Sequence, residues 1–89
     1  MMFHYDIKIE GKVQNVGFRF YAQKKAHELE ITGYVKNMKD GSVFIEAEGE
    51  EINLNQYVNW CHKGPPWATV TDVKVNKSPV MNYRGFLIK

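Results

Sequence analysis

The chain has 89 residues, enough for one domain, and its 44% hydrophobic and 25% charged residues are typical of a globular protein. A net charge of +2 is too small to indicate a nucleic-acid or membrane partner, and a single cysteine excludes an intrachain disulfide. The sequence contains neither the apolar run of a signal peptide nor the ~20 apolar residues that span a bilayer. We therefore expect one monomeric domain over residues 1–89, located in the cytoplasm.

The first half of the chain predicts a strand, a helix and a hairpin. Residues 3–9 alternate between apolar and polar side chains, which is the period of a half-buried strand. Residues 19–30 contain no proline, glycine or β-branched residue, and apolar side chains recur there at three- and four-residue steps, as on one face of a helix. Strands are expected at residues 32–38 and 42–48, because the Asp40-Gly41 pair between them favours a tight hairpin turn.

The second half predicts a helix and two more strands. The expected elements are a helix from Glu50 or Glu51 to about Lys63, a strand at about 68–75, a loop at 76–83 and a short strand marked by Phe86 and Ile88. Gly64 and the two prolines after it end the helix. The order β-α-β-β-α-β, followed by a short C-terminal strand, indicates an α+β, ferredoxin-like sandwich in which an antiparallel sheet carries both helices on one face.

The segment Gly11–Arg19, which joins the first strand to the first helix, has the features of an anion-binding turn. A helix N-terminus offers unpaired backbone N–H groups and a partial positive charge, and a tight turn before it can direct further N–H groups at the same anion. Gly17 allows an anion to approach the backbone closely, and Asn15 tolerates a left-handed conformation. Arg19 adds a permanent charge whose planar fork binds two phosphate oxygens. Taken alone, the same spacing fits an ordinary strand–helix turn with a solvent-facing arginine equally well.

The wider pattern resembles the acylphosphatase family over nearly the whole chain. The turn Gly11-Lys-Val-Gln-Asn-Val-Gly-Phe-Arg19 and the segment Gly33-Tyr-Val-Lys-Asn37 together form a specific signal, stronger than either part alone. The other matching segments are Ala26-x-x-Leu29, Asp40-Gly41-Ser-Val43, Glu48-Gly49, Gly64-Pro65-Pro66 and Ala68-x-Val70-x-x-Val73. Two positions depart from the family pattern: Asn15 stands where the family usually has glycine, and Glu30-Ile31 replaces a Gly-Leu or Gly-Val pair.

The resemblance implies the hydrolysis of a small-molecule acyl phosphate to a carboxylate and inorganic phosphate, with no cofactor, metal ion, nucleic acid or membrane involved. It makes Arg19 the phosphate-binding residue and Asn37 the residue that orients the attacking water. The residues expected to bind the substrate phosphate are Gln14, Asn15, Val16, Gly17, Phe18 and Arg19. Without the resemblance, the preferred interpretation of Asn37 is a strand-end residue that forms a turn hydrogen bond.

An acyl phosphate needs few catalytic groups. Its leaving group is a carboxylate, whose conjugate acid has a pKa of roughly 4 to 5, so its departure needs no general acid. Phosphoryl transfer then requires mainly positioning and stabilisation of charge, which the loop amides and Arg19 can supply. Asn37 is too weak a base to deprotonate water, but its amide can accept a hydrogen bond from water and hold it in line.

The remaining polar and reactive residues are expected to have structural roles. Cys61 shares the apolar face of the second predicted helix, which indicates a core position. Two sets of residues are expected at the surface or at edges: the histidines, because no metal-ligand spacing links them, and a run of glutamates. They are His4, His27 and His62, and Glu46, Glu48, Glu50 and Glu51.

Two other functions are compatible with this fold. A non-catalytic module that recognises a phosphate or carboxylate would keep the turn and lack turnover. An RNA-binding domain would need aromatic-rich strands exposed on the sheet. The expected strand at residues 42–48 holds one aromatic residue and two carboxylates, so the sequence does not favour RNA.

Overall fold

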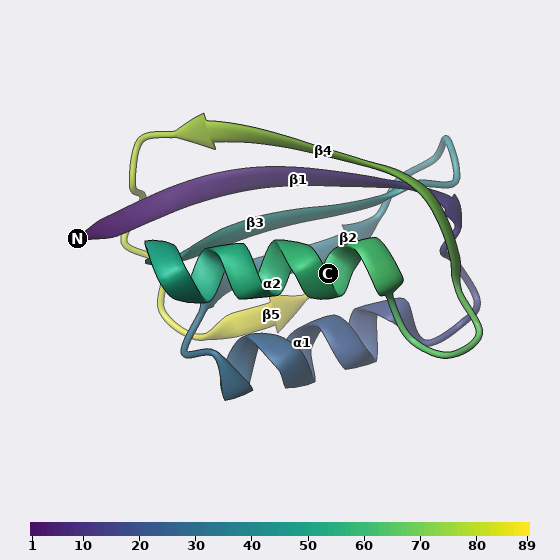
Figure 1. Ribbon diagram of the computed structural model, residues 1–89, viewed down its shortest axis with the longest axis horizontal. Coiled ribbons are helices and arrows are strands. Elements are labelled where there is room, and N and C mark those ends of the chain that lie inside the picture. Colours follow the sequence, from purple (N-terminus) through teal and green to yellow (C-terminus); the bar gives the residue numbers. More distant parts are fainter.

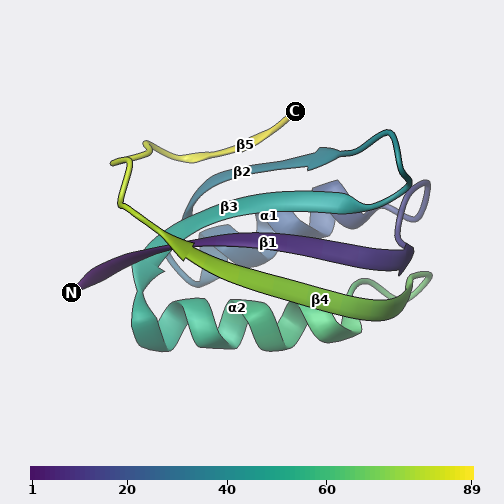
Figure 2. The same ribbon diagram turned by 90° about the horizontal axis from the view of Figure 1, so that it is seen from above.

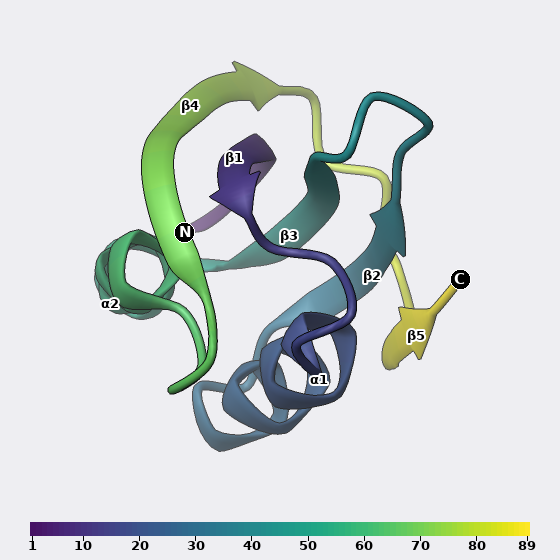
Figure 3. The ribbon, with the colours of Figure 1, turned by 90° about the vertical axis from the view of Figure 1, so that its right-hand side faces the viewer.

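The structure, a computed structural model, describes residues 1–89 and contains five strands and two helices. They are β1 (Met2–Lys12), α1 (Phe18–Glu28), β2 (Thr32–Asn37), β3 (Val43–Glu50), α2 (Glu51–Lys63), β4 (Thr69–Ser78) and β5 (Phe86–Ile88). Both helices lie side by side along one face of the sheet (Figure 1), and the end-on view shows the two layers (Figure 3). The layered α+β architecture is the one that the sequence predicts. Neither helix has the length and apolar character needed to cross a membrane.

The sheet has the strand order β4-β1-β3-β2-β5. The first four strands are antiparallel to their neighbours, as predicted, but β5 pairs in parallel with β2. This direction follows from the path of residues 79–85 (Figure 2). They cross the sheet from the end of β4 to its far edge, and the chain turns there so that β5 runs in the opposite direction to β4. We name residues 79–85 the crossover segment. The fifth strand therefore turns the predicted antiparallel sheet into a mixed one.

Three strands extend beyond their predicted ends. β3 continues to Glu50 through its pairing with β1, and β1 continues to Lys12 and β4 to Ser78 because these two strands pair along their length. The pairing shifts register between Glu10 and Gly11, which is a β-bulge, and then continues. The hydrogen bonds between the strands thus continue past the alternation of apolar and polar residues from which the strand ends were predicted. The loop predicted after residue 75 begins only after Ser78.

The hydrophobic core fills the space between the sheet and the two helices. The strands contribute alternate residues, which include Tyr5, Ile7, Ile9, Val43, Ile45 and Ala47, and the helices contribute Phe18, Ala22, Ala26, Leu54, Tyr57 and Cys61. Burying a large apolar side chain contributes about 1.5–3 kcal/mol to stability. Cys61 is fully buried, which confirms its predicted core position.

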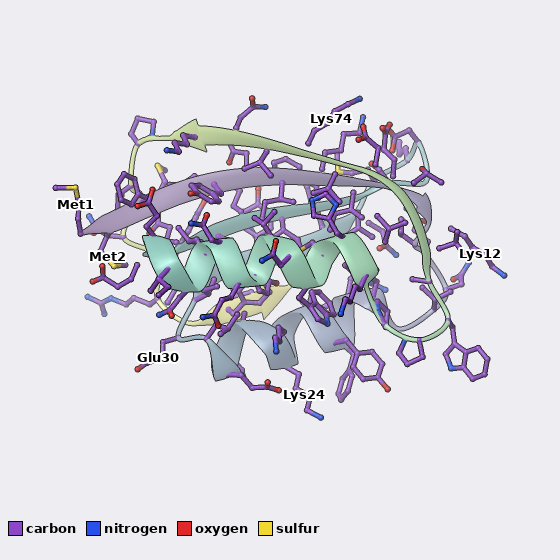
Figure 4. All side chains as sticks on the ribbon, in the orientation of Figure 1. Met1, Met2, Lys12, Lys24, Glu30 and Lys74 are labelled. Atoms are coloured by element: carbon purple, nitrogen blue, oxygen red, sulfur yellow. The ribbon has the colours of Figure 1, made fainter.

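The end of α1 accounts for one of the departures from the family pattern. Glu30 has φ 56°, the left-handed conformation in which helices commonly end with glycine. Its side chain projects away from the body of the molecule (Figure 4). The position therefore constrains the backbone conformation and not the size of the side chain. The next residue, Ile31, is buried in the core, and its N–H donates to the Ala26 carbonyl at 2.8 Å. This departure thus concerns local backbone and packing, at the opposite end of α1 from the turn.

The face of the sheet opposite the helices overturns one prediction. His4 and Glu48 are 2% and 1% exposed, so the expectation that histidines and glutamates lie at the surface was wrong for these two. The cause is the crossover segment, which lies over this end of the open face (Figure 2) and donates two backbone N–H groups to Glu48. His27 and His62 are exposed on the helices, as predicted.

Candidate active site

The turn between β1 and α1 has the backbone conformation that an anion site needs. Asn15 and Gly17 have φ 61° and φ 78°, both in the left-handed region. Gly17 is the N-cap of α1, and no side chain caps the helix there. The N–H groups of the first helical turn therefore face outward without a side-chain acceptor, as at helix N-termini that bind anions. The turn faces the viewer in Figure 3, beside the end of β2.

A pocket of about 290 Å³ lies at this turn and brings together residues from three parts of the chain. Five of the residues predicted from the sequence line it: Asn15, Gly17, Phe18, Arg19 and Asn37. The pocket therefore joins the turn to Asn37, which lies 18 positions beyond Arg19 at the end of β2. The walls also include Val13, which lies within the predicted turn, Phe20, which directly follows it, and Ile88, which no local pattern relates to the turn.

Arg19 carries the positive charge of the pocket. It is exposed, and its Nη1 donates to the backbone carbonyl of Lys89 at 3.0 Å. No acidic side chain forms an ion pair with it. One hydrogen bond thus orients the guanidinium, while the rest of its planar fork remains for the oxygens of an anion.

Asn37 has an unusual hydrogen-bonding state. Its side-chain oxygen, Oδ1, is fully buried and has no hydrogen-bond donor within the protein. A buried acceptor without a donor costs about 1–3 kcal/mol, and native proteins leave few of them. Asn37 also lines the pocket, so this unpaired acceptor belongs to a residue that a ligand or water in the pocket would contact.

Two residues predicted to bind phosphate do not line the pocket. The Gln14 side chain donates from Nε2 to the carbonyls of Met38 and Ser42, at 2.8 and 2.9 Å. Both acceptors belong to the β2–β3 turn, so this amide links the anion-binding turn to the hairpin that carries Asn37. Val16 is partly buried and packs against the core. For Gln14 and Val16, only the backbone remains for contact with a phosphate.

The β2–β3 turn that receives Gln14 is itself held by hydrogen bonds. Asp40 Oδ1 accepts from the Ser42 hydroxyl at 2.6 Å and from the Ser42 N–H at 2.9 Å. These two bonds, together with Lys8 at 3.0 Å, hold the pKa of Asp40 well below its usual range. The turn next to Asn37 is thus held both by hydrogen bonds among its own residues and by the Gln14 side chain.

We expect the left-handed conformation of Asn15 to decide which residues position 15 tolerates. Asn15→Gly should retain the stability of the protein to within a few tenths of a kcal/mol, since glycine adopts this φ without strain. Asn15→Val should lose about 1–2 kcal/mol, because a β-branched side chain clashes at positive φ. Urea unfolding of both variants measures this, and equal stability of the two would contradict a strained turn.

Topology and site together define a class of protein: an α+β domain of ferredoxin-like topology with a cationic pocket at its first strand–helix turn. The chain belongs to the acylphosphatase family, whose model matches residues 5–88.

Individual relatives agree with this assignment along the whole chain. The acylphosphatase of Thermotoga maritima is 49% identical over 93% of this chain and 92% of the relative. That of Archaeoglobus fulgidus is 47% identical over 91% of each chain. The crystal structure of acylphosphatase from Bacillus subtilis matches with a TM-score of 0.96 at 39% identity, covering 100% of this chain and 99% of that one. The ferredoxin-like fold is thereby confirmed, and the chain is an acyl phosphate hydrolase.

Proposed function

We propose that Arg19 and the backbone N–H groups of the turn hold the phosphoryl group of an acyl phosphate, and that Asn37 holds the water that attacks it. The water oxygen forms a bond to phosphorus as the bond from phosphorus to the acyl oxygen breaks, which releases a carboxylate and inorganic phosphate. The proton lost by the water passes to a phosphoryl oxygen or to solvent. A pocket of about 290 Å³ suits a small-molecule substrate.

The electrostatics of the pocket suit this reaction. Charge on the phosphoryl oxygens grows toward the transition state, and donors already in place stabilise it without reorganisation. No acidic side chain pairs with Arg19, and its contact with Lys89 limits its movement. Because the leaving group is the anion of a carboxylic acid, the reaction proceeds without a general acid in the pocket.

The observation that carries this proposal is the buried, donor-free Oδ1 of Asn37. An oxygen that accepts a hydrogen bond from water fixes the position of that water, and fixed geometry alone can supply several kcal/mol of rate acceleration. A non-catalytic phosphate-binding module would gain nothing from an unsatisfied acceptor beside its cationic group.

Hydrolysis of a synthetic acyl phosphate tests the proposal. Purified protein treated with a chelator should hydrolyse benzoyl phosphate with many turnovers, and inorganic phosphate should inhibit competitively. Competitive inhibition without turnover would instead identify the non-catalytic phosphate- or carboxylate-binding module.

We expect Gln14 to act as a positioning residue. Gln14→Glu keeps the shape of the side chain but removes both N–H donors to Met38 and Ser42, so the turn and Asn37 lose their common tether. Misplacement of this kind should lower kcat by about 10- to 100-fold, with a smaller change in inhibition by phosphate. Gln56→Glu, on the exposed side of α2, is the matched control. Unchanged kcat in Gln14→Glu would show that the tether does not position Asn37.

A further inference from the structure

A buried charged cluster lies on the open face of the sheet and shares no residue with the pocket. It is built from two neighbouring cross-strand pairs of β1 and β3, His4 with Glu48 and Asp6 with Glu46. His4 and Glu48 are almost fully buried, while Asp6 and Glu46 are half-buried. The proposed reaction uses none of these side chains.

Both ring nitrogens of His4 face carboxylate oxygens. Nδ1 lies 2.7 Å from Glu48 Oε2, and Nε2 lies 2.9 Å from Asp6 Oδ1 and 3.1 Å from Glu46 Oε1. A neutral imidazole has one N–H and one lone pair, so it would turn a lone pair toward an acceptor. Only the imidazolium, with two N–H groups, satisfies both sides.

The charges around the ring favour the same protonation state. Burial lowers the pKa of His4, but the hydrogen bonds to Glu48 and Asp6 outweigh it, and the pKa is raised above its usual 6.5. Burial likewise raises the pKa of Glu48, but hydrogen bonds from Met81, His4 and Tyr83 outweigh it, and that pKa is lowered from its usual 4.5.

The cluster ties the crossover segment to the sheet. Glu48 accepts the backbone N–H of Met81, and its other oxygen accepts that of Tyr83 at 3.1 Å. The Tyr83 hydroxyl donates to Glu46 at 2.7 Å, and the Ser78 hydroxyl at the end of β4 donates to Asp6 at 2.6 Å. Every carboxylate that faces His4 therefore also holds the crossover segment or the strand that leads into it.

We propose that protonated His4 is a latch that fastens the crossover segment, and through it β5, onto the open face of the sheet. The proton lets three carboxylates share one small buried space. When His4 loses this proton, a lone pair faces a carboxylate, the carboxylates repel one another, and their grip on the segment weakens. The latch is thus closed while His4 keeps this proton and opens as pH rises through the raised pKa of His4.

The pH window follows from the signs of the two pKa shifts. The stabilisation by His4 is complete below 6.5 and is lost as pH rises through its raised pKa in the folded protein. The stabilisation by Glu48 is complete above 4.5 and is lost as pH falls through its lowered pKa. The phenol of Tyr83 does not open the latch in this window, because its hydrogen bond to Glu46 raises its pKa to about 12.

The latch also bears on the pocket, although this step rests on the proposed function. β5 follows the crossover segment directly, Ile88 lines the pocket, and the carbonyl of the next residue, Lys89, holds Arg19. A released segment would therefore loosen one wall of the pocket.

The same atoms of His4, Asp6 and Glu46 lie within 4.8 Å of one another, a spacing that also suits a metal ion. The carboxylates, however, are already occupied by protein donors: Ser78 bonds to Asp6, and both Tyr34 and Tyr83 bond to Glu46. The observed arrangement is complete with a proton, and metal binding becomes an outcome of the test.

The test compares the wild type with His4→Gln and with His27→Gln, the matched control on the exposed face of α1. In wild type and control, the folding equilibrium constant should fall by up to about tenfold per pH unit as pH rises from 6.5 toward the pKa of His4 in the folded protein. His4→Gln should be less stable at pH 6.5 and lack this component. Its amides at Met81 and Tyr83 should exchange with solvent about tenfold faster than in the wild type, while those in the middle of β3 should lose protection only as far as the global free energy of unfolding falls.

Three results would overturn the latch. The first is an unchanged pH dependence in His4→Gln. The second, which needs no variant, is a wild-type NMR titration of the His4 ring that gives a pKa at or below 6.5. The third is stabilisation of chelator-treated wild type by Zn²⁺ under alkaline conditions that is absent from His4→Gln, which would make the cluster a metal site. None of these readouts involves catalysis, so failure of the latch and failure of the proposed function are distinguishable.

Discussion

Arg19→Gln is expected to abolish measurable hydrolysis of benzoyl phosphate, with a fall in kcat of about 10³-fold or more. Glutamine retains hydrogen-bonding capacity but lacks the charge and the planar fork that match the phosphoryl oxygens. Because Arg19 is proposed to contact the anion before and during the reaction, competitive inhibition by inorganic phosphate should weaken as well. Initial rates at several substrate and phosphate concentrations measure both effects.

The control for this substitution is Arg84→Gln. Arg84 is exposed in the crossover segment and does not line the pocket, so its loss changes the net charge equally without touching the site. Arg84→Gln should keep near-normal kinetics. Near-normal kinetics in Arg19→Gln would remove the phosphate-binding role from Arg19 and, with it, the assignment of the pocket.

Asn37→Ala is expected to separate catalysis from binding. The substitution removes the oxygen proposed to hold the attacking water, so kcat should fall by about 10²-fold or more, while KM and inhibition by phosphate change little. Folding should be unaffected or slightly improved, because the variant no longer buries an acceptor without a donor. Steady-state kinetics and urea unfolding on the same preparation measure the two effects.

Asn59→Ala, on the exposed side of α2, controls for the loss of an amide elsewhere in the chain and should change neither rate nor affinity. A collapse of phosphate affinity in Asn37→Ala with kcat preserved would contradict the proposed role and make Asn37 a binding residue. A large loss of stability would instead indicate that its side chain supports the β2–β3 turn.

The two variants together separate the two halves of the site. Arg19 reaches the pocket from α1 and Asn37 from the end of β2, and the Gln14 side chain hydrogen-bonds the turn before α1 to the β2–β3 turn. Loss of Arg19 should affect binding and rate together, whereas loss of Asn37 or Gln14 should affect mainly the rate.

Local sequence was sufficient for the order of the elements and for the location of the turn that lines the pocket. Strand and helix periods are properties of neighbouring residues, and the features of the turn lie within Gly11–Arg19. Asn37 lies in a second motif, and only the resemblance of the chain to the acylphosphatase family predicted that it acts together with the turn. The pocket that contains both residues agrees with that prediction.

Tertiary structure decided what depends on partners that are far apart in the chain. The Gln14 side chain turns away from the pocket because the carbonyls of Met38 and Ser42 are within its reach. Ile88 enters the pocket and β5 runs parallel to β2 because the crossover segment carries the chain to the far edge of the sheet. That segment also buries His4 and Glu48. Both occupy polar positions in strands whose side chains alternate between apolar and polar, and this pattern predicts a solvated face. The two-residue period of a strand predicts which residues share a face of the sheet. Contacts between distant segments decide what covers that face.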